Sequence, residues 1–270
     1  MTESSRPKFL LVKLSSLGDV LHNLPIVWDI RERFPNAQID WVVEEGYVEL
    51  LKPLQSKEGF KGIDRIIPIA LRRWKKNIFS SKNWQEFKTF IQTLRKEKYD
   101  EVIDFQGLIK SAVVCSLAKR SAQGNTTGLA NATEYSSYEP LARMFYSQSV
   151  QVPKQCHAID RSRYLLSSAC QIPLINRTVS PKFYSKSVVD DLFQKNISDD
   201  QREFVRPYVL CFHATARDAK KWDTNNWIII GKYLISRGFN PVFPWGNTFE
   251  KQTSEDLVSQ IGGGIVPSAF

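Results

Sequence analysis

The sequence of 270 residues has only four cysteines, at Cys115, Cys156, Cys170 and Cys211. They form no CxxC pair or Cys/His ligand spacing, which argues against a zinc site or a disulfide framework and indicates reduced, mostly buried thiols. No stretch approaches the roughly 18 consecutive apolar residues that span a bilayer. The first eight residues are polar, so we expect no signal peptide and a cytoplasmic chain.

Several motifs of common enzymes are also missing. The chain has neither a GxGxxG turn nor a P-loop, so a dinucleotide-binding or NTP-hydrolysing enzyme loses its usual support. No DxD pair follows an apolar strand. The three histidines, His22, His157 and His213, are scattered, and each is expected to be structural. We therefore expect no metal ion and no cofactor.

The residues that are present describe an ordinary globular protein, with 42% hydrophobic and 24% charged residues. Short apolar runs alternate with stretches of helical periodicity along the first 120 residues. This alternation predicts an α/β fold built on a parallel sheet. The expected strands are residues 8–14, 39–43, 65–69 and 99–105, and the expected helices are 20–34, 84–98 and 108–119.

The second half of the chain repeats the pattern after an interruption. Expected helices at 140–146 and 158–169 precede a proline-containing stretch, and then come strands at 208–213 and 240–244 and helices at 227–236 and 249–261. These features predict an N-terminal Rossmann-like domain of residues 1–172, a linker at 173–187 and a C-terminal domain of residues 188–270. Two clear strands are few for an independent sheet, so we expect the C-terminal domain to be incomplete.

The positive charge is concentrated in one stretch. Residues 56–98 contain twelve lysines or arginines and four acidic residues, which accounts for almost all of the net charge of +9. The densest part is the basic knot, residues 71–76 with the sequence LRRWKK. Such a patch attracts polyanions, whether nucleic acid, anionic lipid or an acidic sugar, although a solvated helix face would have the same composition.

Three loops leave predicted strands at the edge of the sheet where open α/β proteins bind ligands. In the first, Asp19 either complements the dipole of the following helix or accepts a proton from an attacking hydroxyl. Lys13 is either the charge partner of Asp19 or an edge lysine. In the second loop, Asp104 and Gln106 either bind ligand or tie neighbouring loops together.

The third loop follows the strand at 208–213. Its hydroxyl and cations suit a diphosphate, with Thr215 donating a hydrogen bond and Lys220 supplying charge. After the next strand, Glu250 follows a tight Pro-Trp-Gly turn and is a candidate ribose ligand.

Six segments together resemble the lipopolysaccharide heptosyltransferase I family. They are KLSSLGDVLH (13–22), WVVEEG (41–46), RRWKK (72–76), DFQGLIKS (104–111), HATARD (213–218) and PWG (244–246). The resemblance runs in order from about residue 8 to 255. It implies a GT-B glycosyltransferase with two Rossmann-like domains facing a cleft, the N-terminal one for the acceptor and the C-terminal one for the nucleotide sugar.

The family transfers L-glycero-D-manno-heptose from ADP-heptose to the first Kdo of Kdo2-lipid A, with inversion. The resemblance implies that Asp19 is the general base, that Lys13 assists it, and that Thr215, Lys220 and Glu250 hold the donor. It further implies that the acceptor anions meet six residues: Arg72, Arg73, Trp74, Lys76, Arg161 and Arg163. It also implies a peripheral position on the cytoplasmic face of the inner membrane.

The sequence departs from the family pattern at two places. The usual pair of threonines in the phosphate loop is Thr215-Ala216 here, and the family's Asp-Thr-Gly segment with a nearby histidine is absent. The chain therefore resembles a truncated enzyme. One other function class remains open at this point, a non-catalytic module that binds anionic glycolipid. We expect no nucleic-acid partner for residues 56–98, because the sequence has no helix-turn-helix, zinc-finger or RNP pattern.

Overall fold

The computed structural model describes residues 6–78, 80–134, 136–175, 207–215 and 218–267. The chain divides into two units, residues 1–185 and 186–270, and each is described by itself. Most of the predicted linker, from residue 176 to 187, lies outside the described residues, so the predicted domain boundaries stay a prediction.

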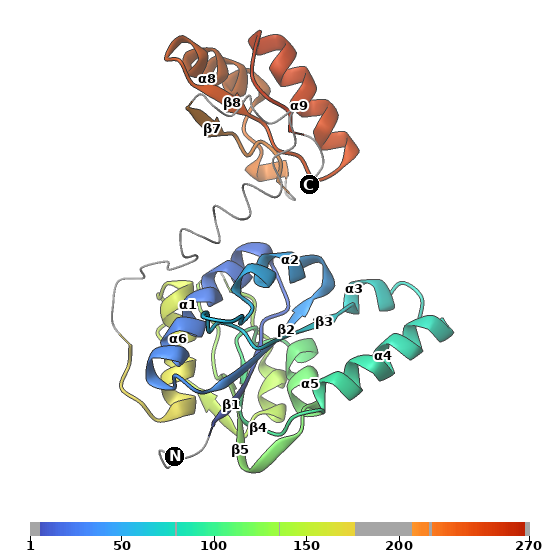
Figure 1. The fold of residues 1–270 in the computed structure, drawn as a ribbon, viewed down its shortest axis with the longest axis vertical. Coiled ribbons are helices and arrows are strands. Elements are labelled where there is room, and N and C mark those ends of the chain that lie inside the picture. The colour runs from blue at the N-terminus through green and yellow to red at the C-terminus, as the bar shows by residue number, and fades with distance from the viewer. Residues whose placement is uncertain (1–5, 79, 135, 176–206, 216–217, 268–270) are drawn as a thin grey trace. The chain divides into compact units, whose positions relative to one another are not determined.

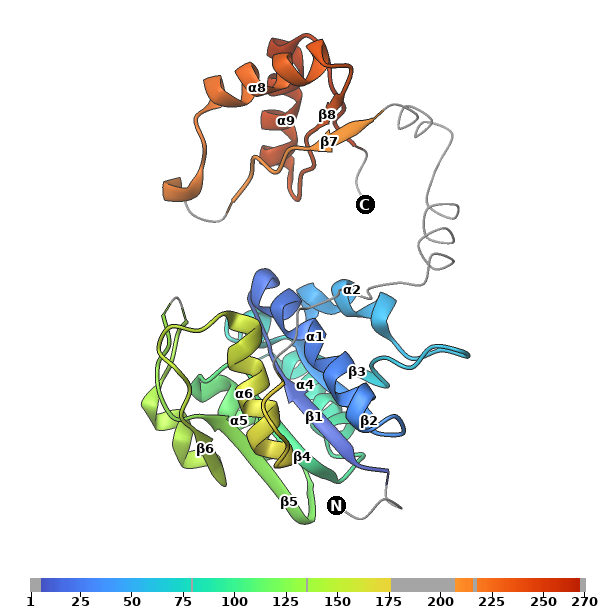
Figure 2. The same ribbon diagram turned by 90° about the vertical axis from the view of Figure 1, so that its left-hand side faces the viewer.

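The first unit is a parallel sheet with helices on both faces (Figures 1 and 2). The strand order is β3-β2-β1-β4-β5-β6, so β1 lies in the middle and pairs with β2 and β4. The strands are β1 (Lys8–Val12), β2 (Gln38–Glu44), β3 (Arg65–Ile69), β4 (Tyr99–Asp104), β5 (Arg120–Leu129) and β6 (Gln148–Val150).

The helices of the first unit fill the connections between these strands. The α-helices are α1 (Leu17–Arg33), α2 (Val48–Leu51), α3 (Leu71–Trp74), α4 (Ser81–Leu94), α5 (Ile109–Leu117) and α6 (Ala158–Cys170). Short 3₁₀ turns are η1 (Glu45–Tyr47), η2 (Lys52–Leu54) and η3 (Pro140–Phe145). None of the described helices combines the length and hydrophobicity that crossing a bilayer requires.

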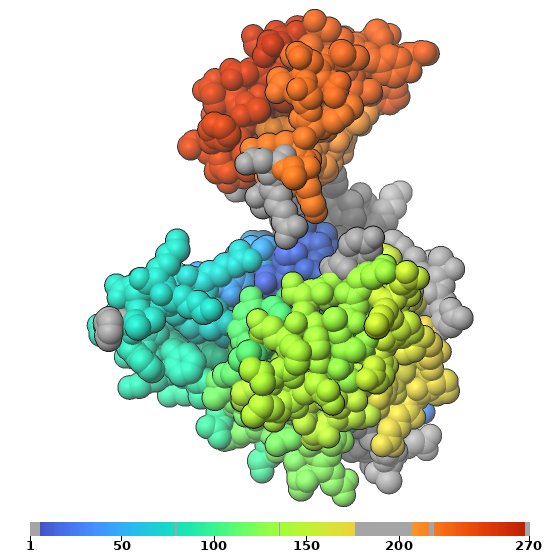
Figure 3. Space-filling model, turned by 180° about the vertical axis from the view of Figure 1, so that it is seen from behind, coloured from blue at the N-terminus to red at the C-terminus, as the bar shows by residue number. Residues whose placement is uncertain are grey.

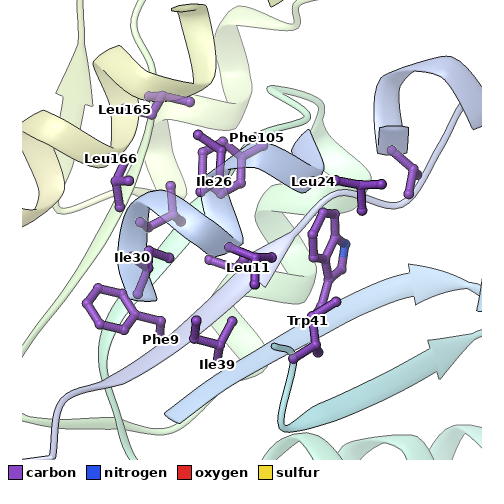
Figure 4. Packing of buried hydrophobic residues seen from close by; sticks show 14 of the residues in the cluster. Phe9, Leu11, Leu24, Ile26, Ile30, Ile39, Trp41, Phe105, Leu165 and Leu166 are labelled. Atoms are coloured by element: carbon purple, nitrogen blue, oxygen red, sulfur yellow. The ribbon is translucent and has the colours of Figure 1, made fainter. Parts of the chain in front are cut away.

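Two apolar layers sandwich the sheet, because alternate residues of each strand point to opposite faces. On one face, Phe9 and Leu11 of β1 and Ile39 and Trp41 of β2 pack under α1 and α6 (Figure 4). On the other face, Leu10 and Val12 of β1 and Val42 of β2 pack against Phe90 and Leu94 of α4 and Val114 of α5. All parallel strands end at one edge, so the loops after them meet there.

The second unit is a smaller α/β layer. It contains β7 (Tyr208–Leu210), η5 (Asp218–Lys220), α8 (Thr224–Ser236), β8 (Asn240–Val242) and α9 (Thr248–Ile261), and β7 pairs with β8 in parallel. Within the described residues, Ile265 adds an isolated bridge to Val242. Gly264 permits this pairing, since its φ is +122° and a Cβ there would lie 2.9 Å from the Pro241 carbonyl oxygen.

The element predictions are confirmed for four strands of the first unit and for the order of strands and helices in the second. Strands β5 and β6 were not predicted. The predicted helix at 140–146 is wrong, because this segment forms the 3₁₀ turn η3, which begins at Pro140 and is stopped after Phe145.

Candidate active site

The centre of the first unit's loop edge is an ion pair between Lys13 and Asp19. Lys13 follows β1 and its side chain is almost fully buried, whereas the Asp19 side chain is 38% exposed. The Lys13 Nζ lies 3.7 Å from Asp19 Oδ1 and donates a hydrogen bond of 3.0 Å to the Phe105 carbonyl oxygen. The pair thus joins a buried cation to a carboxylate that solvent or substrate can reach.

Asp19 occupies the third position of α1, where it caps the helix start. Its Oδ2 accepts hydrogen bonds from the Ser16 amide at 3.0 Å and the Ser16 hydroxyl at 2.8 Å. Burial opposes ionisation of Asp19, but the charge of Lys13 and the two bonds from Ser16 hold its pKa below the usual value. The carboxylate is therefore ionised at neutral pH.

Burial affects Lys13 in the opposite sense to its ion pair. Burial lowers the pKa of Lys13 to about 8, although the charge of Asp19 favours the protonated form. The charge of Arg161 also lowers the pKa of Lys13, which places this guanidinium near the pair. Arg161 is itself buried and donates a 2.9 Å hydrogen bond from Nη1 to the Thr133 hydroxyl.

Arg163 lies elsewhere, although the sequence grouped it with Arg161. Its side chain is 2% exposed and pairs with Asp29 of α1, with Nε 2.9 Å from Oδ2. Residues two positions apart on a helix point to different sides, so Arg161 faces Asp19 while Arg163 faces the contact between α1 and α6. The structure does not bring Arg163 to the site.

The loop after β4 holds the Lys13–Asp19 loop in place. The Gln106 side-chain oxygen accepts hydrogen bonds of 3.2 Å from the amides of Leu14 and Ser15. Asp104 accepts four hydrogen bonds, from the amides of Gln106 and Gly107 and the hydroxyls of Ser111 and Tyr146. Of the two possibilities open for Asp104 and Gln106, the structure shows the loop-tying one.

The basic knot lies at the end of β3, on the same edge of the sheet. Arg73 is held by Glu45 at 3.0 Å and Glu86 at 2.8 Å, and these two partners raise its pKa. The Trp74 indole donates a 2.9 Å hydrogen bond to Glu86 and packs edge-on against Phe87. Two side chains of the knot, Arg73 and Trp74, thus already have partners within the protein.

Arg72 and Lys76 are the outward-facing cations of the predicted set. The Arg72 guanidinium lies over the Tyr47 ring, 5.6 Å from its centroid, and its amide donates to Glu44. Neither Arg72 nor Lys76 has an ion pair with another residue in the described ranges, and both are exposed. These two side chains can meet an anion without giving up an internal partner.

In the second unit, the predicted donor residues lie at the carboxyl ends of β7 and β8. Thr215 is half-buried in the loop after β7, and Lys220 is exposed at the end of η5. Glu250 lies in the first turn of α9 and accepts a 2.7 Å hydrogen bond from the Gly246 amide. Since β7 and β8 are adjacent and parallel, these loops leave one edge of the sheet.

His213 ties the loop after β7 to helix α9. Its Nε2 lies 2.7 Å from the Ser254 hydroxyl of α9, and its ring is buried. Burial lowers the pKa of His213, while the nearby charge of Glu250 opposes the shift. This is the structural role that the sequence indicated. Among the described residues, no three His, Cys, Asp or Glu side chains gather to hold a metal ion.

Ser16, Glu45, Glu86 and Thr133 are four of the partners that the sequence did not predict. Only Ser16 carries a sequence signal, because Ser16 and Asp19 have the S-x-x-D spacing of a capping box. The other three lie 28 residues or, for Glu86, 13 residues from their arginine partners, so only the tertiary fold brings each pair together.

Comparisons with known proteins agree with this arrangement. Residues 87–264 match the family model of glycosyltransferase family 9 (heptosyltransferase). Lipopolysaccharide heptosyltransferase 1 of Escherichia coli K12 is 35% identical over 93% of this chain and 72% of its own length. The enzyme of that name from Pseudomonas aeruginosa PAO1 is 33% identical, over 96% of this chain and 66% of its own length.

Solved structures give the same answer. The E. coli heptosyltransferase WaaC with ADP-2-deoxy-2-fluoro heptose superposes with a TM-score of 0.78 at 31% identity, covering 97% of this chain and 76% of the other. A family 9 glycosyl transferase from Veillonella parvula shares the fold at 18% identity with a TM-score of 0.66. The predicted GT-B class of α/β fold is thereby confirmed. The chain belongs to glycosyltransferase family 9, the heptosyltransferases.

Proposed function

We propose that this glycosyltransferase moves L-glycero-D-manno-heptose from ADP-heptose to the first Kdo of Kdo2-lipid A, with inversion at the anomeric carbon. The observation that carries the proposal is the Lys13–Asp19 pair, which presents an ionised, reachable carboxylate at the loop edge of the sheet. The names of the relatives support heptose transfer in lipopolysaccharide synthesis, and one related structure contains a fluorinated ADP-heptose.

Asp19 acts as the general base in this mechanism. Its carboxylate takes the proton of the acceptor hydroxyl, whose oxygen attacks the anomeric carbon of the heptose. The bond between that carbon and the diphosphate breaks, and ADP leaves with the electron pair. Attack opposite to the leaving group inverts the anomeric configuration.

Lys13 and Arg161 prepare Asp19 for this role. Two buried cations beside one carboxylate keep it deprotonated until the hydroxyl arrives, since both charges lower the pKa of Asp19. The hydrogen bonds from Ser16 and the support of Gln106 hold the loop in one geometry. Lys13 is a positioning and electrostatic partner in this account.

Thr215, Lys220 and Glu250 bind the donor. The Thr215 hydroxyl donates to a phosphate oxygen, the exposed Lys220 ammonium adds charge, and the Glu250 carboxylate accepts from a ribose hydroxyl. Their common position after β7 and β8 supports this assignment, because open α/β sheets bind nucleotides at the carboxyl ends of their strands.

Arg72 and Lys76 bind the acceptor anions, with Arg73 available if its carboxylate partners exchange for those of the acceptor. Trp74 supports this surface from beneath through Glu86 and Phe87. Because the proposed acceptor is a membrane lipid, the enzyme works at the cytoplasmic face of the inner membrane as a peripheral protein.

The direct test is transfer by the purified protein. The purified protein is incubated with ADP-heptose and Kdo2-lipid A, and the products are identified by mass spectrometry. We expect the mass of the lipid to increase by one heptose. The anomeric configuration of the new linkage, determined by NMR and compared with that of the donor, reports inversion. Transfer to lipid A that lacks Kdo, or none from ADP-heptose to any acceptor, would contradict the proposal.

A further inference from the structure

The segment after α3 and the first turn of α4 each expose one large apolar side chain. Ile78 is 59% exposed and Trp84 is 56% exposed. The Trp84 ring packs edge-on against Phe87, with centroids 6.0 Å apart, and leaves its remaining surface to solvent. We call residues 75–78 and 80–88 the α3–α4 tip. Two large apolar side chains exposed within seven residues of the chain favour a contact surface over a solvated one.

The same tip carries uncompensated positive charge. Four of its lysines are exposed and have no ion pair with any residue of the described ranges: Lys75, Lys76, Lys82 and Lys88. Glu86 is the tip's one acidic residue in the sequence, and it is occupied by Arg73 and the Trp74 indole. The tip therefore combines exposed apolar side chains with four exposed lysines that have no ion pair in the described part of the chain.

The tip has a firm base. Trp74 packs edge-on against Phe87 and Phe90, with centroids 5.8 and 6.1 Å apart, which fastens α3 to α4. Ser80 caps the start of α4 by accepting a hydrogen bond from the Asn83 amide. Figures 1 and 3 show α3 and the start of α4 as a projection of the first unit. The exposed side chains are thus presented on ordered structure.

We propose that the α3–α4 tip docks onto the surface of an anionic phospholipid bilayer. Trp84 and Ile78 enter the interfacial layer, and the lysines contact phosphates of the head groups. A nucleic acid would satisfy the lysines but not Ile78, whereas a lipid surface satisfies both kinds of side chain. This inference rests on the proposed function, in which the acceptor is a membrane lipid, and it names the element that reaches the membrane.

Vesicle co-sedimentation tests docking without any substrate. Vesicles of phosphatidylcholine, alone or with one third phosphatidylglycerol, contain no lipopolysaccharide, so only the bilayer surface is offered. We expect the wild type to partition at least 10-fold more strongly to the anionic vesicles and to be released by high salt. Ile78→Ser with Trp84→Ser should lower this partitioning about 10-fold.

Matched controls separate the tip from general stickiness. Lys82→Gln with Lys88→Gln changes only exposed helix positions and should lower partitioning about fivefold. Met144→Ser on η3 removes a side chain that is 80% exposed, and Lys119→Gln with Arg120→Gln removes two exposed cations elsewhere; both should bind as the wild type does. Equal binding by the tip variants and the wild type would overturn the proposal.

Two further measurements assign other outcomes. Binding to duplex DNA that is tighter than binding to anionic vesicles, and lost in the tip variants, would replace the bilayer with a nucleic acid. Heptose transfer is also measured to an acceptor embedded in vesicles and to a deacylated, water-soluble acceptor. The rate with the embedded acceptor, divided by the rate with the soluble one, should be lower in the tip variants than in the wild type. If the wild type binds vesicles but transfers no heptose, the proposed function fails while docking stands.

Discussion

At the scale of single residues, the account depends on two neighbouring charges with different burial. Asp19 is reachable and held ionised, whereas Lys13 is buried and only weakly held in its charged form. The carboxylate is therefore ionised over the whole neutral range, and we predict that Lys13 sets the upper pH limit of activity. Neither property follows from residue type alone: burial weakens the charge of Lys13, whereas Lys13 and the hydrogen bonds from Ser16 keep Asp19 ionised against burial.

The transfer rate should fall as the pH rises through about 8. Lys13 loses its proton there, and its neutral amine no longer holds Asp19 in place through their ion pair. Unfolding does not cause this loss of rate. Above pH 8 Lys13 binds more protons in the unfolded chain than in the folded one, so its titration increases the free energy of unfolding as the pH rises. The pH profile of kcat/KM between 6.5 and 9.5 measures the limb. Lys13→Met should transfer heptose more slowly and should show no decrease in kcat/KM near pH 8. A decrease near pH 8 that persists in this variant would mean that another group titrates there.

Arg72 and Arg73 should differ as acceptor ligands. Arg72→Ala should raise the acceptor KM about 10-fold, because its guanidinium faces outward with only the Tyr47 ring beneath it. Arg73→Ala should have a smaller effect, since Glu45 and Glu86 already neutralise it. The donor KM should stay within twofold in both, and Arg120→Ala serves as the control. A larger rise in donor KM would remove the basic knot from the acceptor site.

At the scale of elements, the sequence predicted those parts whose hydrophobic pattern matches their burial. The segment Lys8–Val12 is an apolar run and becomes the buried central strand β1. In β5, by contrast, only the last four residues are buried, and the first six contain no large apolar side chain, so no strand pattern exists. β6 has three residues, too few for periodicity. Pairing with β4 and β5 forms these strands.

The contact between α1 and α6 depends on the buried Asp29–Arg163 pair. Arg163→Met should lower the free energy of unfolding by about 3 kcal/mol, because it leaves the Asp29 carboxylate buried without this partner. Chemical denaturation followed by circular dichroism measures the change. The double variant Asp29→Leu with Arg163→Met should lose less than the single variant. Wild-type stability with a raised acceptor KM in Arg163→Met would return this arginine to the site.

At the scale of the whole molecule, the sequence located the candidate site better than it assigned the partners within it. Asp19 in the first unit and Thr215 and Glu250 in the second could be proposed from the sequence, because the loops after parallel strands leave one edge of each sheet. The role of Gln106 and the division between Arg161 and Arg163 required the fold, because each depends on which distant backbone or side chain lies opposite. The net charge of +9 says where anions collect, not which one binds.

The most direct test of the account is the effect of Asp19→Asn on heptose transfer from ADP-heptose. The substitution keeps the size of the side chain and its hydrogen-bonding position beside Ser16 but removes the charge. We predict at least a 100-fold loss of kcat with an unchanged circular dichroism spectrum and a donor affinity within threefold of the wild type. Near-wild-type turnover in this variant would contradict the account, because transfer would then proceed without the carboxylate that is proposed to take the proton of the acceptor hydroxyl.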